Sequence, residues 1–162
     1  MKTELHDFIV DFLDRHKILT LATNRPDGWP QATTVSYVND GLVLFAFIAR
    51  VGQKYRNIQH DPRLSIAIAG EFRHANQIRG LSMAARAEFV SDRREFDHVW
   101  KMFLTRHPEF NSVGHPNPAM APLVRMVPEW ISVVDYTNVF GHSELTKVAP
   151  RDLGARSGAY SD

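Results

Sequence analysis

The chain begins with a stretch in which apolar side chains recur at helical spacing. Within residues 3–16 they form one stripe, made of Leu5, Phe8, Ile9, Phe12 and Leu13. A surface helix buries such a stripe against the core. The ionisable residues at 16 and 17 follow it, at the end where the helix dipole favours positive groups. The pattern therefore predicts a first helix over residues 3–16.

A second long helix is predicted over residues 92–106. Its apolar stripe consists of Phe96, Val99, Trp100, Phe103 and Leu104. Asp92 is a favourable N-cap, and Glu95 follows three residues later, which is the spacing of a capping box. Trp100 lies on the apolar stripe, so we expect it in the core.

Between and after these helices the pattern is typical of short strands. We predict strands over 18–23, 31–38, 42–48, 64–69, 81–90, 123–127 and 130–135, the last two separated by Pro128. Turn residues fill 24–28 and 39–41. The strand at 42–48 has almost no polar face and is expected to be buried on both sides. A short helix is expected around 54–59, whereas 70–80 and 107–122 are irregular.

These elements indicate a mainly β protein: a small antiparallel barrel of six to seven strands with peripheral helices. With 162 residues, 44% of them hydrophobic, the chain suits one domain. We place that domain at residues 1–148. Residues 149–162 contain little apolar material, and we expect them to form a flexible tail.

Composition excludes several classes of function. The absence of cysteine excludes disulfides, cysteine-ligated zinc, iron–sulfur clusters and thiol nucleophiles. A formal net charge of +1 gives no broad field for nucleic acid or an anionic membrane, so neither partner is expected. The longest apolar run, 42–49, is too short to span a bilayer, and charged residues within the first ten argue against a signal peptide. We expect a soluble, cytoplasmic protein.

The sequence carries none of the common catalytic or metal-binding motifs. Its eight histidines form neither an H-x-H nor an H-E-x-x-H pattern. His107 and His115 flank the irregular segment. With a third ligand they would be candidates for a metal site, but we interpret them as surface imidazoles, so no metal site is predicted. We find no P-loop, no G-x-G-x-x-G and no pair of carboxylates placed for acid–base chemistry. No catalytic residue is therefore assigned.

A resemblance rests on an ordered set of short segments. They are LTLAT (19–23), DGWPQ (27–31), TTV (33–35), QKYRNI (53–58) and DPRLS (61–65), followed by RGLSM (79–83) and FGH (140–142). In this order they resemble the pyridoxamine 5'-phosphate oxidase-like family of FMN-binding split barrels, over about residues 10–145. The resemblance implies a Greek-key-like split barrel, a homodimer with the flavin at the subunit interface, and a small-molecule substrate or electron donor.

The resemblance also implies a set of cofactor-binding positions. FMN requires a cationic pocket for its phosphate, a flat apolar slot for its ring and donors near the polar ring edge. The matching positions are Thr33, Thr34, Val35, Ser36, Phe47, Ile48, Arg50, Gln53, Lys54, Arg79 and Gly80. Of these, Gln53 and Lys54 take the place of the phosphate-binding pair, and Thr33 to Ser36 follow the flavin and ribityl chain. Arg56 is expected on the surface.

Two departures from the family pattern leave the identity of the cofactor undecided. Gln53 stands where the oxidases carry arginine, although Arg50 is near enough in sequence to restore the charge. Ile48 stands where a hydroxyl residue is common. These departures leave haem or a deazaflavin as alternatives, in a binding or sensor protein on the same fold. His142 is then a candidate for the cofactor groove or for a structural hydrogen bond.

The substrate is not implied. The oxidases end with a tryptophan- and arginine-containing stretch that completes their vitamin pocket, and residues 140–147 do not match it. Oxidation of pyridoxamine 5'-phosphate is therefore not favoured. Trp29 follows a turn and is a candidate interface residue, whereas Trp130 fits either a core or an interface.

Overall fold

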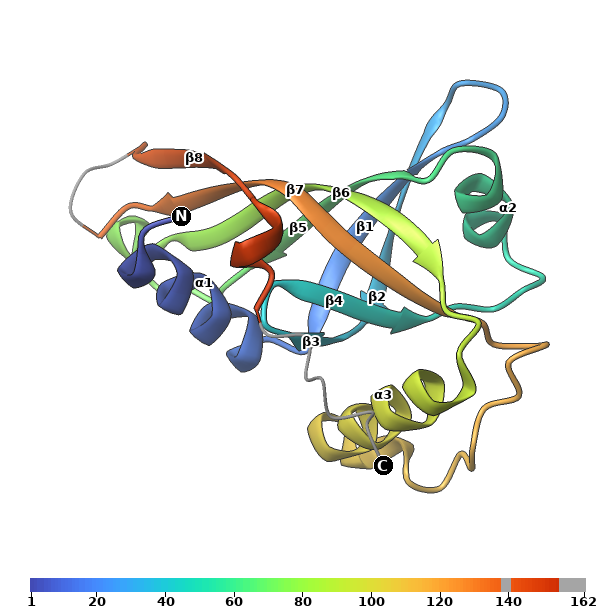
Figure 1. Cartoon of the computed structure of the whole chain (residues 1–162). Coiled ribbons are helices and arrows are strands. Elements are labelled where there is room, and N and C mark those ends of the chain that lie inside the picture. Colours follow the sequence, from blue (N-terminus) through green and yellow to red (C-terminus); the bar gives the residue numbers. More distant parts are fainter. Residues whose placement is uncertain (138–140, 155–162) are drawn as a thin grey trace.

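The computed structural model describes residues 1–137 and 141–154, which form an antiparallel sheet curled into a half-barrel with helices around it (Figure 1). The helices are α1 (Thr3–Arg15), α2 (Gln53–His60) and α3 (Arg93–Arg106), with short 3₁₀ turns at Ala75–Gln77, Pro108–Phe110 and Pro150–Asp152. The strands are β1 (Ile18–Asn24), β2 (Pro30–Ser36), β3 (Val38–Asp40), β4 (Val43–Phe47), β5 (Arg63–Ala69), β6 (Arg79–Phe89), β7 (Leu123–Asp135) and β8 (Ser143–Lys147). The predicted split-barrel fold is confirmed.

The strand order explains why the sheet curls. It runs β2-β1-β5-β6-β7-β4-β3, and β8 pairs with β7. Only Tyr37 separates β2 from β3, so the two ends of this order are joined by the chain itself. The strand predicted over 31–38 is thus divided in two, and β8 was not predicted at all.

The longest strand, β7, is the place where the barrel splits. One of its edges pairs with β6 along almost its whole length. The other edge is shared: β4 takes the Leu123 end and β8 takes the stretch from Trp130 to Val134. The prediction of two strands separated by Pro128 was wrong. A register shift opposite Ala84 and Ala85 absorbs the missing N–H of the proline, so the strand continues through it.

Two apolar clusters hold the fold together. The larger fills the barrel and includes Leu19, Leu21, Ile66 and Met83, with α1 packed against it. The smaller joins α3 to the outer side of β3 and β4. Strand β4 contributes to both clusters, since Leu44 and Ala46 face the barrel while Val43 and Phe45 face α3. The prediction that this strand is buried on both sides is therefore confirmed, as is the core position of Trp100.

The start of α3 differs from the predicted capping box. Asp92 caps the helix by accepting hydrogen bonds from the backbone N–H groups of Arg94 (2.7 Å) and Glu95 (3.2 Å). The Glu95 carboxylate does not return the bond to the cap. It pairs instead with Arg125, whose guanidinium also reaches Glu88. The pair with Arg125 joins two opposite charges, whereas the capping bond would join the carboxylate to an uncharged N–H group.

Residues 149–154, which lie within the expected tail, pack against the barrel in the structure. The backbone N–H of Leu42 donates to the carbonyl of Leu153 (3.1 Å), and Asp152 accepts from the N–H of Ala149 (2.8 Å). Gly41 permits this approach, because its φ is +57° and a Cβ there would lie 2.5 Å from the Leu153 carbonyl oxygen. The remaining positions, 155–162, lie outside the described residues. No helix of the described part of the chain is long and apolar enough to cross a membrane.

Tyr37 provides a test of how the barrel closes. Its ring is fully buried between β2 and β3, and its hydroxyl donates to the carbonyl oxygen of Leu13 at the end of α1 (2.8 Å). Tyr37→Phe leaves that carbonyl buried without its partner, so we expect a loss of about 1–3 kcal/mol in the free energy of unfolding, measured by urea denaturation. Tyr55→Phe removes an exposed hydroxyl contact with Arg50 and is the control, with little change expected. Equal effects of the two substitutions would contradict this view of the closure.

Candidate functional site

A buried polar cluster lies where α2 meets β1 and β2. At its centre is Asn57, which is 0% exposed. Its side-chain amide donates to Thr23 Oγ1 (2.9 Å) and to Gln31 Oε1 (3.0 Å), while its Oδ1 accepts from Gln53 Nε2 (2.9 Å). The amide thus links one helix to two strands. Sequence reasoning missed this cluster, although the spacing of Gln53 and Asn57, one helical turn apart, was a signal that the two side chains meet.

Lys54 is the unpaired cation of this region. Its side chain is half-buried and has no hydrogen bond or ion pair with any described residue. Burial lowers its pKa below the ordinary value for lysine, because the charged form loses water. The two neighbouring arginines are occupied: Arg50 binds the carbonyl of Ala119 (2.6 Å), and Arg56 binds that of Val51 (3.2 Å).

The matching stretch of β2 divides between the two faces of the sheet. Val35 belongs to the barrel core, and Thr33 shares its inward face. The Thr33 hydroxyl is buried and finds no hydrogen-bond partner among the described residues. Thr34 and Ser36 alternate to the outer face. Only one of the hydroxyls in this stretch is therefore an unused polar group inside the barrel.

The side chains of Phe47 and Ile48 pack against other side chains of the protein. The Phe47 ring meets three aromatic rings of α3 edge to face, at centroid distances of 5.3–5.5 Å. Ile48 is 4% exposed within the barrel core. The side chains at these two positions are therefore not available to a cofactor.

Arg79 and Gly80 lie at the opposite end of the sheet from Lys54. Gly80 pairs with Ala69 at the far end of β5, whereas α2 leads into the near end of that strand at Arg63. A strand rises about 3.3 Å per residue, so the two ends of β5 lie about 20 Å apart over its six steps. The Arg79 guanidinium pairs with Asp135 (3.2 Å) and lies over the ring of Phe8. A single chain therefore does not bring all the predicted positions together.

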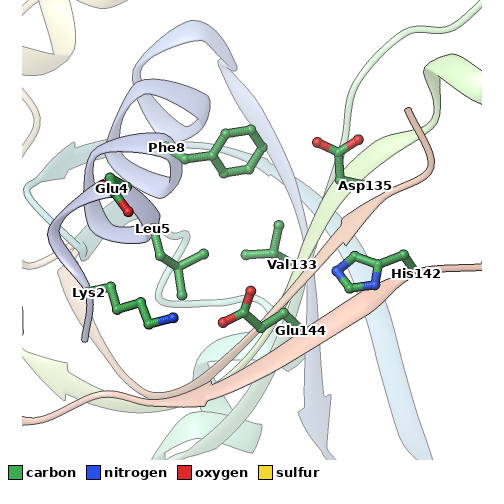
Figure 2. A pocket seen from close by; sticks show the side chains of 8 residues that line it. All are labelled: Lys2, Glu4, Leu5, Phe8, Val133, Asp135, His142 and Glu144. Carbon is green, nitrogen blue, oxygen red and sulfur yellow. The ribbon is translucent and has the colours of Figure 1, made fainter. Parts of the chain in front are cut away.

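A cavity of about 450 Å³ lies beside this second group, between α1 and the strands β7 and β8 (Figure 2). Leu5 and Phe8 extend into it from the helix, facing Val133 on the strand, and His142 and Glu144 line its other side. His142 is exposed at this position. The cavity is thus apolar at its floor and polar at its rim.

His107 and His115 each contact another part of the protein. His107 is 1% exposed, and its Nε2 lies 2.9 Å from the carbonyl oxygen of Tyr37, so its interpretation as a surface imidazole was wrong. The Phe103 ring stacks on it, which explains its burial. His115 instead pairs with Asp97 of α3 (3.0 Å). Among residues 1–137 and 141–154 no group of three or more His, Asp or Glu side chains is placed to hold a metal ion.

The two remaining tryptophans lie on the surface. Trp29 is 73% exposed and lies just before β2, in the turn of the β1–β2 hairpin. Trp130 lies on the outer face of the sheet, 40% exposed, with the ammonium of Lys147 over its ring. Neither ring is part of the barrel core.

Comparisons with known proteins agree on the fold. A family model described as pyridoxamine 5'-phosphate oxidase matches residues 5–135. The structure is similar to a haem-binding protein from Mycobacterium smegmatis, with a TM-score of 0.75 and 19% identity over 91% of this chain and 59% of that one. It is also similar to a conserved hypothetical protein from Mycobacterium tuberculosis (TM-score 0.71, 23% identity, 93% and 94% covered) and to an F420 reductase (TM-score 0.60, 25% identity, 75% and 93% covered). No curated protein sequence matches the chain.

The unpaired charge of Lys54 has a consequence for stability. A lysine with a lower pKa in the folded than in the unfolded state binds its proton less tightly when folded. Its charge therefore opposes folding at neutral pH, and this cost disappears as the pH rises toward the unfolded value of about 10.4. We expect Lys54→Met to raise the free energy of unfolding at neutral pH, by less than about 1 kcal/mol because solvent screens the half-exposed group.

Urea denaturation of the ligand-free protein at neutral and alkaline pH measures this effect. The gain should shrink as the pH approaches the pKa of unfolded lysine. Lys101→Met, at an exposed position of α3, is the matched control and should change little at either pH. A loss of stability in Lys54→Met at neutral pH would show that Lys54 has a stabilising partner after all.

Proposed function

The chain belongs to the pyridoxamine 5'-phosphate oxidase family, and from that premise we propose that it is an FMN-binding flavoprotein, an oxidoreductase that acts on a small molecule. The observation that carries the proposal is Lys54, a half-buried ammonium without a partner among the described residues. A protein keeps such a charge at a cost in stability, and binding an anion is the common reason to keep it.

The start of α2 fits a phosphate group. Gly52 occupies the N-cap position of the helix, and no side chain caps it. The backbone N–H groups of the first turn are therefore without a capping side chain, and helix N-termini attract anions through such groups. Lys54 adds a positive charge within this first turn. Because Arg50 and Arg56 are occupied elsewhere, Lys54 supplies this charge without help from them.

The inner face of β2 fits the rest of the cofactor. Thr33 offers a buried hydroxyl that lacks a partner among the described residues, in the stretch that the resemblance aligns with the flavin and ribityl chain. A sugar-alcohol chain is rich in hydroxyls, which both donate to and accept from a threonine. The flavin itself supplies the hydride or electron chemistry, so the protein needs no nucleophile. The role of this chain's residues is to bind, orient and shield the cofactor.

A homodimer accounts for the separation of the predicted positions. Arg79 lies at the far end of β5, and α2 leads into its near end, so the length of the strand, about 20 Å, lies between them. We propose that one cofactor meets both groups because Arg79 comes from a second copy. The outer face of the sheet offers a surface for that copy. Short exposed or half-exposed side chains cover it across β1, β5 and β6, namely Thr20, Ala22, Ser65, Ala67, Ser82 and Ala84. These positions carry no charge, and the core of an interface is poor in charged residues.

Haem and deazaflavin remain the alternatives, and a spectrum separates them. A haem-binding protein and an F420 reductase are among the similar structures, and Gln53 and Ile48 depart from the usual flavin set. We would purify the protein under native conditions and record its ultraviolet–visible spectrum before and after heat release of any ligand. Release of FMN, identified by mass, supports the proposal. A Soret band would instead support haem as the cofactor, and a released deazaflavin would support a deazaflavin. A colourless protein that takes up no FMN contradicts it.

Substitution of Lys54 tests the phosphate site. We expect Lys54→Ala to weaken FMN binding at least about tenfold, because charge-assisted hydrogen bonds contribute about 1.5–3 kcal/mol. Fluorescence titration of the apoprotein measures the dissociation constant. Arg56→Ala, on the same helix and exposed, is the matched control and should leave the constant within about twofold. Unchanged affinity in Lys54→Ala would remove this residue from the site.

Substitution of Ala67 tests the dimer surface. Ala67 lies between Thr20 and Ser82 in the middle of the outer face. An arginine there would place a bulky charge in the centre of the interface, so we expect Ala67→Arg to convert a dimer into a monomer in sedimentation equilibrium at micromolar concentration. Thr105→Arg, at an exposed position of α3, should leave the dimer intact. A monomeric mass for the unsubstituted protein would refute the dimer.

A further inference from the structure

We propose that Asn57 is a positioning residue for the cofactor site, and that its amide sets where the first turn of α2 stands relative to the inner edge of β2. The inference deepens the proposed function and rests on it. It concerns a residue that contacts no cofactor itself. Asn57 acts through Gln53 on its own helix and through Gln31 on the facing strand.

The bonds of Asn57 fix its orientation. Both hydrogens of Nδ2 are used, one by Thr23 Oγ1 and one by Gln31 Oε1, and Oδ1 faces the donor of Gln53. Turning the amide over would bring its oxygen against the oxygen of Gln31 and its nitrogen against the nitrogen of Gln53. With 0% exposure, water is not at hand to replace a lost bond. The three partners are therefore held in one arrangement.

Each partner is next to a group that the proposed function uses. Gln53 immediately precedes Lys54 in the first turn of α2. Gln31 lies two residues before Thr33 on the same face of β2, about 7 Å along the strand. The amide of Asn57 thus connects the unpaired ammonium with the unpartnered hydroxyl through two short segments. A shift of α2 on the barrel would change the distance between them.

The cluster also explains what Gln53 does. Its amide turns toward Asn57, so it is used within the protein. The side chain left for a ligand in this turn is that of Lys54. A polar cluster is also an unusual choice at a buried site, since apolar groups of the same shape give equal or greater stability. Its value lies in holding a defined geometry, which an apolar contact specifies less sharply.

Two matched substitutions test this role. Asn57→Leu removes the amide at the site. Asn39→Leu removes a comparable one elsewhere: Asn39 is 5% exposed on β3, and its Nδ2 donates to Asp14 Oδ1 and to the carbonyl of Gly41, both at 3.0 Å. Both variants should lose thermal stability. Only a positioning residue should in addition change the surroundings of Lys54.

Two readouts are needed, and the first does not involve a cofactor. The pKa of Lys54, followed by NMR in the ligand-free protein, should rise toward its ordinary value in Asn57→Leu, because a loosened helix returns water to the ammonium. It should not move in Asn39→Leu. The second readout is the FMN dissociation constant, which should increase about tenfold or more in Asn57→Leu and less than about twofold in Asn39→Leu.

The outcomes separate this inference from the proposed function. An unchanged Lys54 pKa in Asn57→Leu, or an equal change in Asn39→Leu, overturns the positioning role even if FMN binds. A Lys54 pKa that responds only to Asn57→Leu in a protein that fails to bind FMN upholds the positioning role and rejects FMN. If Asn57→Leu does not fold, Thr23→Val removes one acceptor of the same amide at nearly constant volume, and it should change the Lys54 pKa in the same direction.

Discussion

The structure depends on the closure of the sheet at Tyr37. Because β2 and β3 are consecutive in the chain yet lie at opposite ends of the strand order, the sheet must curl until those ends meet. Curling gives the sheet an inner face, which apolar side chains at alternate positions fill. Its outer face must be covered by other elements or carry polar side chains. At β3 and β4 the cover is α3 with its aromatic rings. Across the middle of β1, β5 and β6 the outer side chains are short and uncharged, whereas Arg63 and Arg86 lie at one end of this face.

The same closure determines where a site is possible. Side chains fill most of the barrel, so a cofactor must bind at its ends and edges, and Thr33 is within reach of such a site because β2 is an end strand of the order. At one end, α2 contacts β1 and β2 through the hydrogen bonds of Asn57 as well as through apolar side chains. At the other end, the split of β7 between β4 and β8 opens the cavity below α1. The two ends lie a full strand apart, which is why a second copy enters the proposed function.

The sequence predicted the helices and strands better than the contacts that they make with distant segments of the chain. Helical stripes at 3–16 and 92–106 were correct because spacing along one segment is a local property. The continuity of β7 through Pro128 was missed because the bulge that permits it depends on the opposite strand. His107 was misplaced for a similar reason: nothing near it in the sequence indicates that Phe103 and the Tyr37 carbonyl will enclose it. The capping box failed at Glu95 because Arg125, thirty residues away, competes for the carboxylate.

In the candidate site, too, the roles of the charged and polar side chains depend on contacts with distant residues. From the sequence, Gln53 reads as a weakened phosphate ligand and Arg50 as its replacement. In the fold, Gln53 serves Asn57, and Arg50 holds the segment around Ala119 while its guanidinium lies over the ring of Tyr55. The positive charge at the start of α2 therefore falls on Lys54, with the uncapped N–H groups of the helix beside it. One ammonium and a row of amides bind an anion more weakly than an arginine–lysine pair does, because the second charge is missing. The precise placement of α2 then matters more for affinity, and that placement depends on the amide of Asn57.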